Sequence, residues 1–201
     1  IGLNLSSKVN DDLKFNSRFL ATNNGDNGFT ELKTNSGDGQ ANVALSHVNF
    51  GYTGIKNTTV TVGKQGLATP WTVALDSDGN EQTGTGILAM TTLGQVTLAG
   101  AYFNQTNLDD SGQGTGLFDD GSEDIATAGA ITTLGPVTLD AWYLDAQDIF
   151  DSYTVGAKAA TELSGVKLGA DARWASLEID KELGNDDGDK DTIAKIALTA
   201  D

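Results

Sequence analysis

A short acidic segment has the composition of a cation site. The segment from Asp76 to Asn80 reads Asp-Ser-Asp-Gly-Asn, with side-chain oxygens at alternating positions, and Glu81 follows it. Oxygen atoms are the ligands that Ca2+ prefers. An EF-hand loop that starts at Asp76 would need glycine and glutamate where this chain has Glu81 and Ile87. An EF-hand is therefore excluded, and a simpler Ca2+ site built from Asp76 or Asp78 stays open.

The chain offers few groups for covalent or acid–base catalysis. His47 is the only histidine, so neither a catalytic triad nor a histidine-rich metal site has support. No glycine-rich phosphate loop followed by Lys-Ser or Lys-Thr is present. A glycosidase pair could be drawn from the 28 acidic residues in many ways, and nothing favours one pair. We predict that the protein is not an enzyme.

The charge balance limits the partners. The formal net charge is -16 and the sequence pI is about 4.1, so the phosphates of a nucleic acid would be repelled. Much of this charge lies in three predicted loops, which leaves two interpretations: solvated acidic loops, or a field that favours cations. Cysteine is absent, and no run of 18 apolar residues could form a membrane-spanning helix. The start of the chain already has a strand pattern, so we expect the chain to begin after any export signal.

A hairpin pattern is written three times. Thr91-Thr92-Leu93-Gly94-Gln95-Val96-Thr97-Leu98 returns as Thr132-Thr133-Leu134-Gly135-Pro136-Val137-Thr138-Leu139, and a looser copy starts at Thr161. Each copy contains the end of one strand, a very short turn and a second strand with alternating apolar residues. This repeat predicts an antiparallel meander.

Alternation between polar and apolar residues predicts about eleven strands. They are expected at 1–9, 13–21, 40–52, 58–67, 83–92, 96–105, 124–133, 137–146, 152–163, 166–177 and 191–200. Most of them exceed the five or six residues typical of globular strands and match the roughly 9 to 11 that cross a bilayer with tilt. Short turns also alternate with longer connections, predicted at 22–39, 68–82, 106–123, 147–151 and 178–190. These two regularities favour an all-β, antiparallel transmembrane β-barrel.

The residue pattern of the strands also predicts which face of the sheet contacts water and which contacts lipid. Between residues 166 and 174, Val166, Leu168 and Trp174 share one face, while Lys167 and Arg173 lie on the other. A slip by one residue would move the charges into lipid, so the register is well defined. A single-chain bacterial barrel has an even number of strands, and a water-filled channel needs about 16 or more. We therefore expect 16–18 strands in full, of which residues 1–201 supply about eleven.

A family resemblance rests on the collinear order of several stretches. These are Ser7 to Phe19, Gly63-Lys64-Gln65, Trp71-Thr72 followed by an acidic loop and Gly84-Thr85-Gly86, and Thr138 to Leu183. In this order the chain resembles the bacterial trimeric porins, most closely the Campylobacter-type major outer membrane protein family. The resemblance implies an 18-stranded, cation-preferring homotrimer in the outer membrane of a Gram-negative bacterium, in contact with lipid and lipopolysaccharide. It also implies that residues 68–82 fold into the lumen as a constriction, where a Ca2+ ion could bind.

A porin needs no nucleophile, because the width and charge of its pore decide which solutes pass. In the implied constriction, Asp76, Asp78 and Glu81 supply carboxylates. We expect basic side chains of the wall to face them across the pore, namely Arg18, Lys64, Lys158 and Arg173. The resulting function is a passive diffusion channel for small hydrophilic solutes and ions.

The alternative is a secreted or surface-bound all-β structural or adhesive protein whose acidic loops bind Ca2+. The two readings differ in the strands, since a barrel needs an apolar outer band on every lipid-facing strand and a soluble sandwich buries one face of each sheet.

Overall fold

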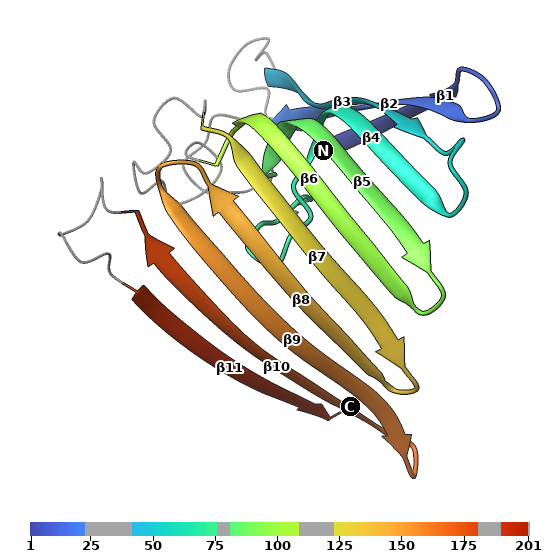
Figure 1. The fold of residues 1–201 in the computed structure, drawn as a ribbon. Helices are drawn as coiled ribbons and strands as arrows, with labels where there is room; N and C mark the ends of the chain where they lie inside the picture. The colour runs from blue at the N-terminus through green and yellow to red at the C-terminus, as the bar shows by residue number, and fades with distance from the viewer. Residues whose placement is uncertain (23–41, 76–80, 109–122, 181–189, 201) are drawn as a thin grey trace, which may run out of the picture. The chain divides into compact units, whose positions relative to one another are not determined.

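The computed structural model describes residues 1–22, 42–75, 81–108, 123–180 and 190–200. The described residues form strands, turns and irregular segments, without a helix. The strands are β1 (Gly2–Lys8), β2 (Leu13–Thr22), β3 (Asn42–Tyr52), β4 (Thr58–Gly66), β5 (Thr83–Leu93), β6 (Val96–Thr106), β7 (Ile125–Leu134), β8 (Val137–Ala146), β9 (Phe150–Leu163), β10 (Val166–Ile179) and β11 (Lys190–Ala200) (Figure 1). The predicted all-β class and the number of strands are confirmed.

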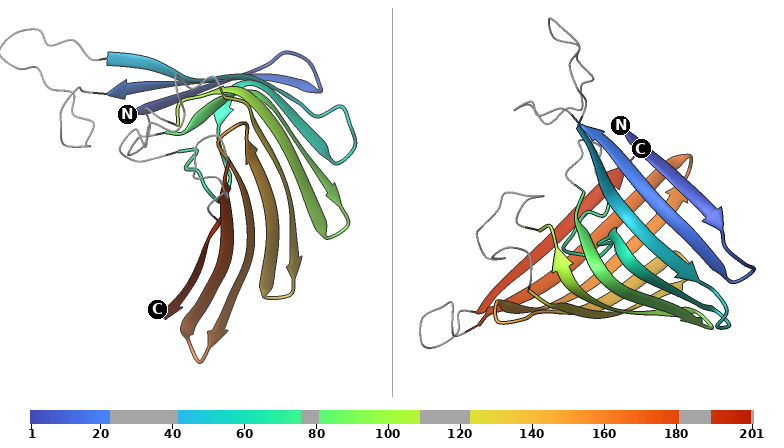
Figure 2. Two further views of the ribbon diagram at one scale, coloured as in Figure 1. Left: turned by 60° about the vertical axis from the view of Figure 1, so that its left-hand side comes forward. Right: turned by 90° about the horizontal axis from the view of Figure 1, so that it is seen from above.

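Strand order follows chain order from β1 to β11, and each register that the structure gives is antiparallel. The chain divides into two compact units, residues 1–87 with 103–122 and residues 88–102 with 123–201. The division falls within β5 and β6. In the second unit, β8 to β11 lie side by side in both views of Figure 2. No helix among the described residues is long and apolar enough to cross a membrane.

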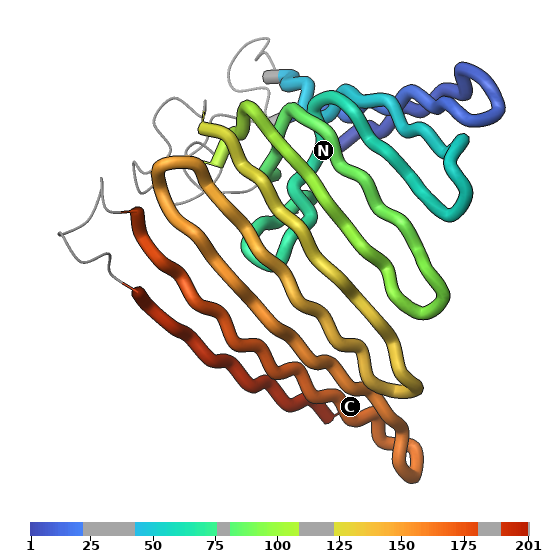
Figure 3. The backbone as a smooth tube through the Cα atoms, in the orientation of Figure 1, coloured from blue at the N-terminus to red at the C-terminus, as the bar shows by residue number. Residues whose placement is uncertain are grey.

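The three repeated hairpins reverse through two residues each (Figure 3). Gly94 and Gly135 have φ values of +64° and +59° at the first turn position, where a type II′ turn requires positive φ. In the third hairpin, Ser164 and Gly165 both have positive φ, as a type I′ turn requires. These turns match the twist of the strands that they join, and each one sets the register of its hairpin.

The connection between β8 and β9 differs from the prediction. It consists of residues 147–149 only, whereas the sequence predicted a longer connection at 147–151. Ile149 is buried, its N–H bonds to the Ala146 carbonyl, and Asp148 has a φ of +59°. A tight turn around a buried apolar side chain therefore replaces the expected loop. The connections at 22–39, 106–123 and 178–190 lie largely outside the described residues, and that at 68–82 is described except for residues 76–80.

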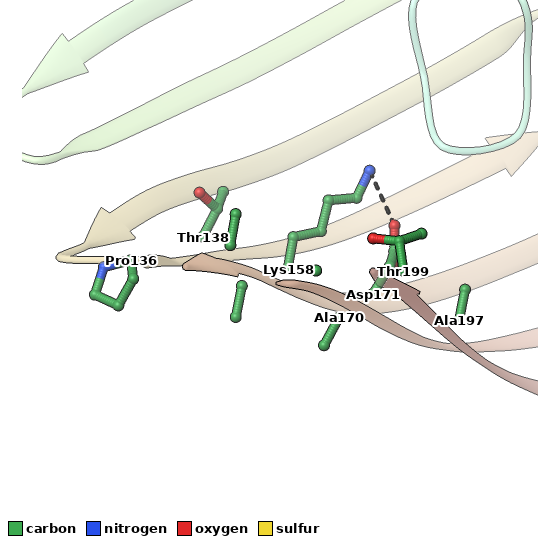
Figure 4. Close-up of a pocket in the computed structure, with 10 residues that line it drawn as sticks. Pro136, Thr138, Lys158, Ala170, Asp171, Ala197 and Thr199 are labelled. Atoms are coloured by element: carbon green, nitrogen blue, oxygen red, sulfur yellow. Dashed lines mark ion pairs between the residues drawn. The ribbon is translucent and has the colours of Figure 1, made fainter. Parts of the chain in front are cut away.

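Charged and apolar residues occupy opposite faces in the second unit. The register sets Lys158 opposite Asp171, and Ala159 opposite Ala170. Figure 4 shows the side chains of Lys158 and Asp171 on one side of the strands and that of Ala170 on the other. The face of Ala170 also carries exposed apolar side chains on four strands: Leu139, Val155, Leu168, Trp174, Ile196 and Leu198. Their exposed fractions run from 37% to 77%, which is typical of a surface that meets lipid.

The first unit has the same two faces. The register places Leu3, Phe19 and Leu45 in one row, and Leu13 with Tyr52 in another on the same face. Phe15 and Phe50 are opposite each other with ring centroids 5.3 Å apart, and Phe50 remains 46% exposed. The opposite face carries Asn, Arg and His side chains and positions the site described next.

Candidate functional site

The polar face of β1 to β3 gathers hydrogen-bonding side chains in two rows. Arg18 is opposite Asn4 on β1 and His47 on β3, and Asn16 is opposite Asn49. Asn16 donates to the side-chain oxygen of Asn49 over 3.2 Å. The pleat alternates side chains between faces, so these residues lie on the side away from the exposed leucines and phenylalanines. This face can interact with water and ions.

The ion pair between Arg18 and Glu81 is the most buried charged contact described on this face. Arg18 Nε and Nη2 donate to Glu81 Oε1 over 2.8 Å and 2.6 Å, and Nε also donates to Oε2 over 3.1 Å. The side chains are only 13% and 1% exposed. Ser46 Oγ donates to Glu81 Oε2 over 2.8 Å, and Arg18 Nη1 donates to Asn4 over 3.1 Å. Each member of the pair therefore has a further hydrogen-bond partner, Asn4 for Arg18 and Ser46 for Glu81.

A β-bulge brings Ser46 into this contact. Arg18 is opposite His47 and Phe19 is opposite Leu45, so Ser46 is an extra residue on β3. A bulge redirects a side chain and disrupts the hydrogen-bond ladder of the sheet only at that residue. Sequence alternation assumes a regular pleat and therefore did not identify Ser46 as a partner of Glu81.

Further bonds hold the connection between β4 and β5 at its two ends. Asn107 donates from Nδ2 to the Glu81 carbonyl over 2.9 Å and accepts from the Thr83 N–H over 2.6 Å. The Gln82 N–H donates to the Val73 carbonyl over 2.9 Å. Leu67 is buried, and its side chain lies with that of Phe103 next to the Cα of Gly84. The described ends of the connection thus pack on the face that carries Arg18.

The second unit has its own bidentate ion pair. Arg173 Nη1 and Nη2 donate to the two carboxylate oxygens of Asp140, both over 2.9 Å, and Nη1 also donates to Thr154 over 3.2 Å. Gly156 on β9 is opposite Arg173 on β10 and opposite Asp140 on β8, so it lies between the two charged residues. A Cβ at Gly156 would lie 2.5 Å from both Arg173 Nη2 and Asp140 Oδ1. Only glycine leaves room for the guanidinium to cross β9.

A third, more exposed pair lies on the same face. Lys158 Nζ and Asp171 Oδ2 are 3.1 Å apart, with side chains 59% and 40% exposed (Figure 4). They border a cavity of about 290 Å3 with Thr138 and Thr199. Water and salt screen such a pair, so it contributes less to stability than the two buried arginine pairs.

Carboxylates concentrate at the end of β8 to β10. A cavity of about 350 Å3 is lined there by five acidic residues, Asp145, Asp148, Asp151, Glu178 and Asp180. Lys190 is 3.6 Å from Glu178. Even so, no group of three acidic or histidine side chains in the described part of the chain could hold a metal ion. The cavity is a region of negative potential, which attracts mobile cations.

Tyrosine side chains lie near the same strand ends, on the face that the register gives to Asp145, Asp151 and Glu178. Tyr143 and Tyr153 are cross-strand neighbours with ring centroids 4.9 Å apart. The Tyr143 hydroxyl donates to Asp151 over 2.7 Å, and the Tyr102 hydroxyl donates to Asp124 over 2.5 Å. The rings therefore lie on apolar surface while the hydroxyl groups reach charged residues. This is the arrangement of aromatic residues at a membrane–water interface.

The structure brings together some of the predicted site residues. Glu81 contacts Arg18, but Lys158 and Arg173 pair with the aspartates of their own unit. The register sets Lys64 opposite Val48, and no described contact joins Lys64 to Arg18 or Glu81, so its role in the pore wall stays a prediction. Asp76 and Asp78 lie outside the described residues, so the predicted Ca2+ site and the facing charges stay predictions.

Comparison with protein-family models and with curated protein sequences gives no match. Solved structures do match. A BenF-like porin from Pseudomonas fluorescens Pf-5 gives a TM-score of 0.72 at 17% identity, over 94% of this chain and 51% of that one. OccK9 (OpdG) of Pseudomonas aeruginosa gives 0.72 at 16% identity, over 100% and 56%. The fold is that of an outer-membrane porin.

A third porin structure, OpdK of Pseudomonas aeruginosa with vanillate, gives a TM-score of 0.71 at 13% identity, over 100% of this chain and 57% of that one. The chain thus spans about half the length of these porins. Its porin fold agrees with the predicted barrel class. The finer resemblance to the Campylobacter-type family is not confirmed by these structures.

Proposed function

We propose that the chain forms part of a passive diffusion channel for small hydrophilic solutes and ions in the outer membrane of a Gram-negative bacterium, with a preference for cations. The support for a channel is the porin fold together with the two faces of the strands. One face is apolar, exposed and bordered by tyrosines, and the other carries the ion pairs. A secreted sandwich would cover its apolar face with a second sheet, so the adhesive alternative has less support.

The observation that carries the cation preference is the pairing of both arginines. The sequence contains only Arg18 and Arg173, and each one binds a carboxylate through two nitrogens. A guanidinium neutralised in this way cannot attract a second anion strongly. The net charge of -16 already includes both arginines, and this excess of carboxylates favours cations near the channel.

Two porins of the same fold have been crystallised with carboxylates. OccK2 (OpdF) of Pseudomonas aeruginosa is a complex with glucuronate, and OpdK is a complex with vanillate. A channel that selects carboxylates needs cationic side chains that remain free to bind them. The paired arginines of this chain favour a general, cation-preferring pore over such selection.

The proposal has further parts that the described contacts do not address. Residues 68–82 form the constriction, Asp76 and Asp78 place carboxylates in it, and Ca2+ can bind there. The channel assembles as a homotrimer, in contact with outer-membrane lipid and lipopolysaccharide.

Reversal potentials in a planar bilayer test this function. With a KCl gradient across the bilayer, the full-length protein should give stepwise conductance and a reversal potential of the sign that marks cation preference. Asp76→Asn combined with Asp78→Asn should lower that preference, because two carboxylates leave the constriction. Asp11→Asn is the control, since Asp11 lies in an exposed turn beside Lys8.

Three results would count against the proposal. Failure to insert into bilayers would favour the adhesive alternative, and a reversal potential of the opposite sign would exclude the cation preference. An unchanged reversal potential in the double variant would remove Asp76 and Asp78 from the constriction while leaving the channel itself intact.

A further inference from the structure

A second polar cavity lies at the ends of β4, β5 and β6, within the first unit. Its volume is about 350 Å3, and it is lined by Lys64, Thr83, Gly84, Thr85, Gln105, Thr106 and Asn107. These strand ends lead into the long connections at 67–82 and 107–124. In outer-membrane barrels the long connections are extracellular, so the cavity belongs to the outer-leaflet end of the sheet.

The register places one side of this cavity, at Lys64, on the apolar face. Lys64 is opposite Val48, and Val62 two residues earlier is 49% exposed on the same face. On β5, the Cβ position of Gly84 points at Leu67 and Phe103, under the connection between β4 and β5. Its neighbours Thr83 and Thr85 therefore point the other way. Neither Leu67 nor Phe103 lines the cavity, as expected for a cavity on the far side of the sheet.

The cavity contains polar groups without partners. Lys64 forms no ion pair among the described residues, although a charged side chain on a lipid-facing surface is costly unless it is paired or near the interface. Thr106 Oγ1 is buried and has no hydrogen-bond partner in the described part of the chain. The hydroxyl of Thr85 comes from the neighbouring strand. A ligand with several acceptor oxygens and a negative charge would satisfy these groups together.

We propose that this cavity binds the phosphate group of an anionic lipid of the outer leaflet, with Lys64 as the charge and the hydroxyls of Thr85 and Thr106 as donors. A lysine ammonium is a common phosphate binder, and basic pockets at headgroup depth bind phosphorylated lipids. The free phosphate ion has the same chemistry, but it lacks the acyl chains that the adjacent apolar face would contact. This inference rests on the proposed function, because it requires the apolar face to lie in a membrane.

Lipid retention tests the site. The full-length protein is placed in phosphatidylcholine nanodiscs with increasing amounts of lipid A, and the lipid A retained after extraction is measured by native mass spectrometry. Lys64→Ala should weaken retention at least about fivefold, as expected for the loss of one charge-assisted hydrogen bond. Thr85→Val should weaken it less. Lys14→Ala is the matched control, since Lys14 is an exposed lysine opposite Lys8 on the polar face.

The arms of this experiment separate the possible outcomes. Equal retention by Lys64→Ala and Lys14→Ala would overturn the site. If a large excess of inorganic phosphate displaces lipid A, the ligand is free phosphate and the assignment to lipid is wrong. A bilayer recording of the same wild-type sample keeps the two proposals apart: stepwise conductance without lipid A retention removes this site alone, and absence of insertion removes the proposed function.

Discussion

Glu81→Ala is expected to lower the free energy of unfolding by about 3–5 kcal/mol, the range found when one partner of a buried ion pair is removed. The substitution leaves the Arg18 guanidinium, whose side chain is only 13% exposed, without its carboxylate. It also removes the acceptor of the Ser46 hydroxyl. Urea-induced unfolding of the refolded full-length protein in lipid vesicles, followed by tryptophan fluorescence, measures the change.

A pair of equal length provides the control. Lys8 and Asp11 are also 2.6 Å apart, but their side chains are 69% and 94% exposed. Asp11→Ala should leave the unfolding midpoint unchanged, because water screens this pair. Equal losses for the two variants would mean that the contact between Glu81 and Arg18 does not hold the connection to the sheet. Glu81→Gln, which keeps the bond from Ser46 and loses the charge, should fall between Glu81→Ala and the wild type.

Leu139→Arg is expected to cost about 1–3 kcal/mol of stability in a bilayer, between the values for a basic residue at an interface and at the midplane, because Leu139 is near one end of β8. Leu139 is 39% exposed and shares its face with Val155 and Ala141. An arginine there must take its charge into lipid or bend toward the interface. The same vesicle unfolding experiment measures the loss.

The neighbouring residue is the matched control for this substitution. Thr138 is opposite Lys158 on the polar face, where an arginine would meet water and Asp171. Thr138→Arg should therefore cost less than half as much as Leu139→Arg. If Thr138→Arg were the more damaging substitution, the polar face would be the buried one and the barrel interpretation would fail.

Much of the fold could be predicted because charges mark one side of the strands. Predicted and observed limits agree within two residues for all eleven strands, from β1 at Gly2–Lys8 to β11 at Lys190–Ala200. In β10, Lys167, Asp171 and Arg173 are all odd-numbered and therefore share one face of the strand. A shift by one residue would turn these charges toward lipid, so only one facing is possible. The two-residue turns then fix each hairpin, as in the pairing of Leu163 with Val166.

The ion pairs could not be predicted in the same way. Arg173 meets Asp140 only if Gly156 lies between them, and that depends on the pairing of Ala146 with Phe150. A connection of 147–151 would instead shift the register by two residues and set Asp140 opposite Lys158, on the same face. A two-residue shift preserves alternation, so the sequence pattern cannot detect it.

Arg18 and Glu81 were predicted to face each other across the pore, but not to form a direct ion pair. Glu81 lies 63 residues away in a connection without periodicity, and 28 acidic residues compete for the role. The register sets Lys64 opposite Val48, and its predicted place in the pore wall stays a prediction. Composition identifies a charge, but pairing decides which side of the sheet the charge occupies.

Cysteine labelling tests the central claim, that one face of the sheet lines a water-filled channel and the other face contacts lipid. The chain has no native cysteine, so single substitutions report one position each. Ala197 is opposite Asp171 on the polar face, and Ala170 is opposite Leu198 on the apolar face (Figure 4). In vesicles of the full-length protein, a charged maleimide should label Ala197→Cys rapidly and Ala170→Cys at least about tenfold more slowly, because the thiolate and the reagent both require water. Equal labelling of the two positions, or faster labelling of Ala170→Cys, would contradict the account.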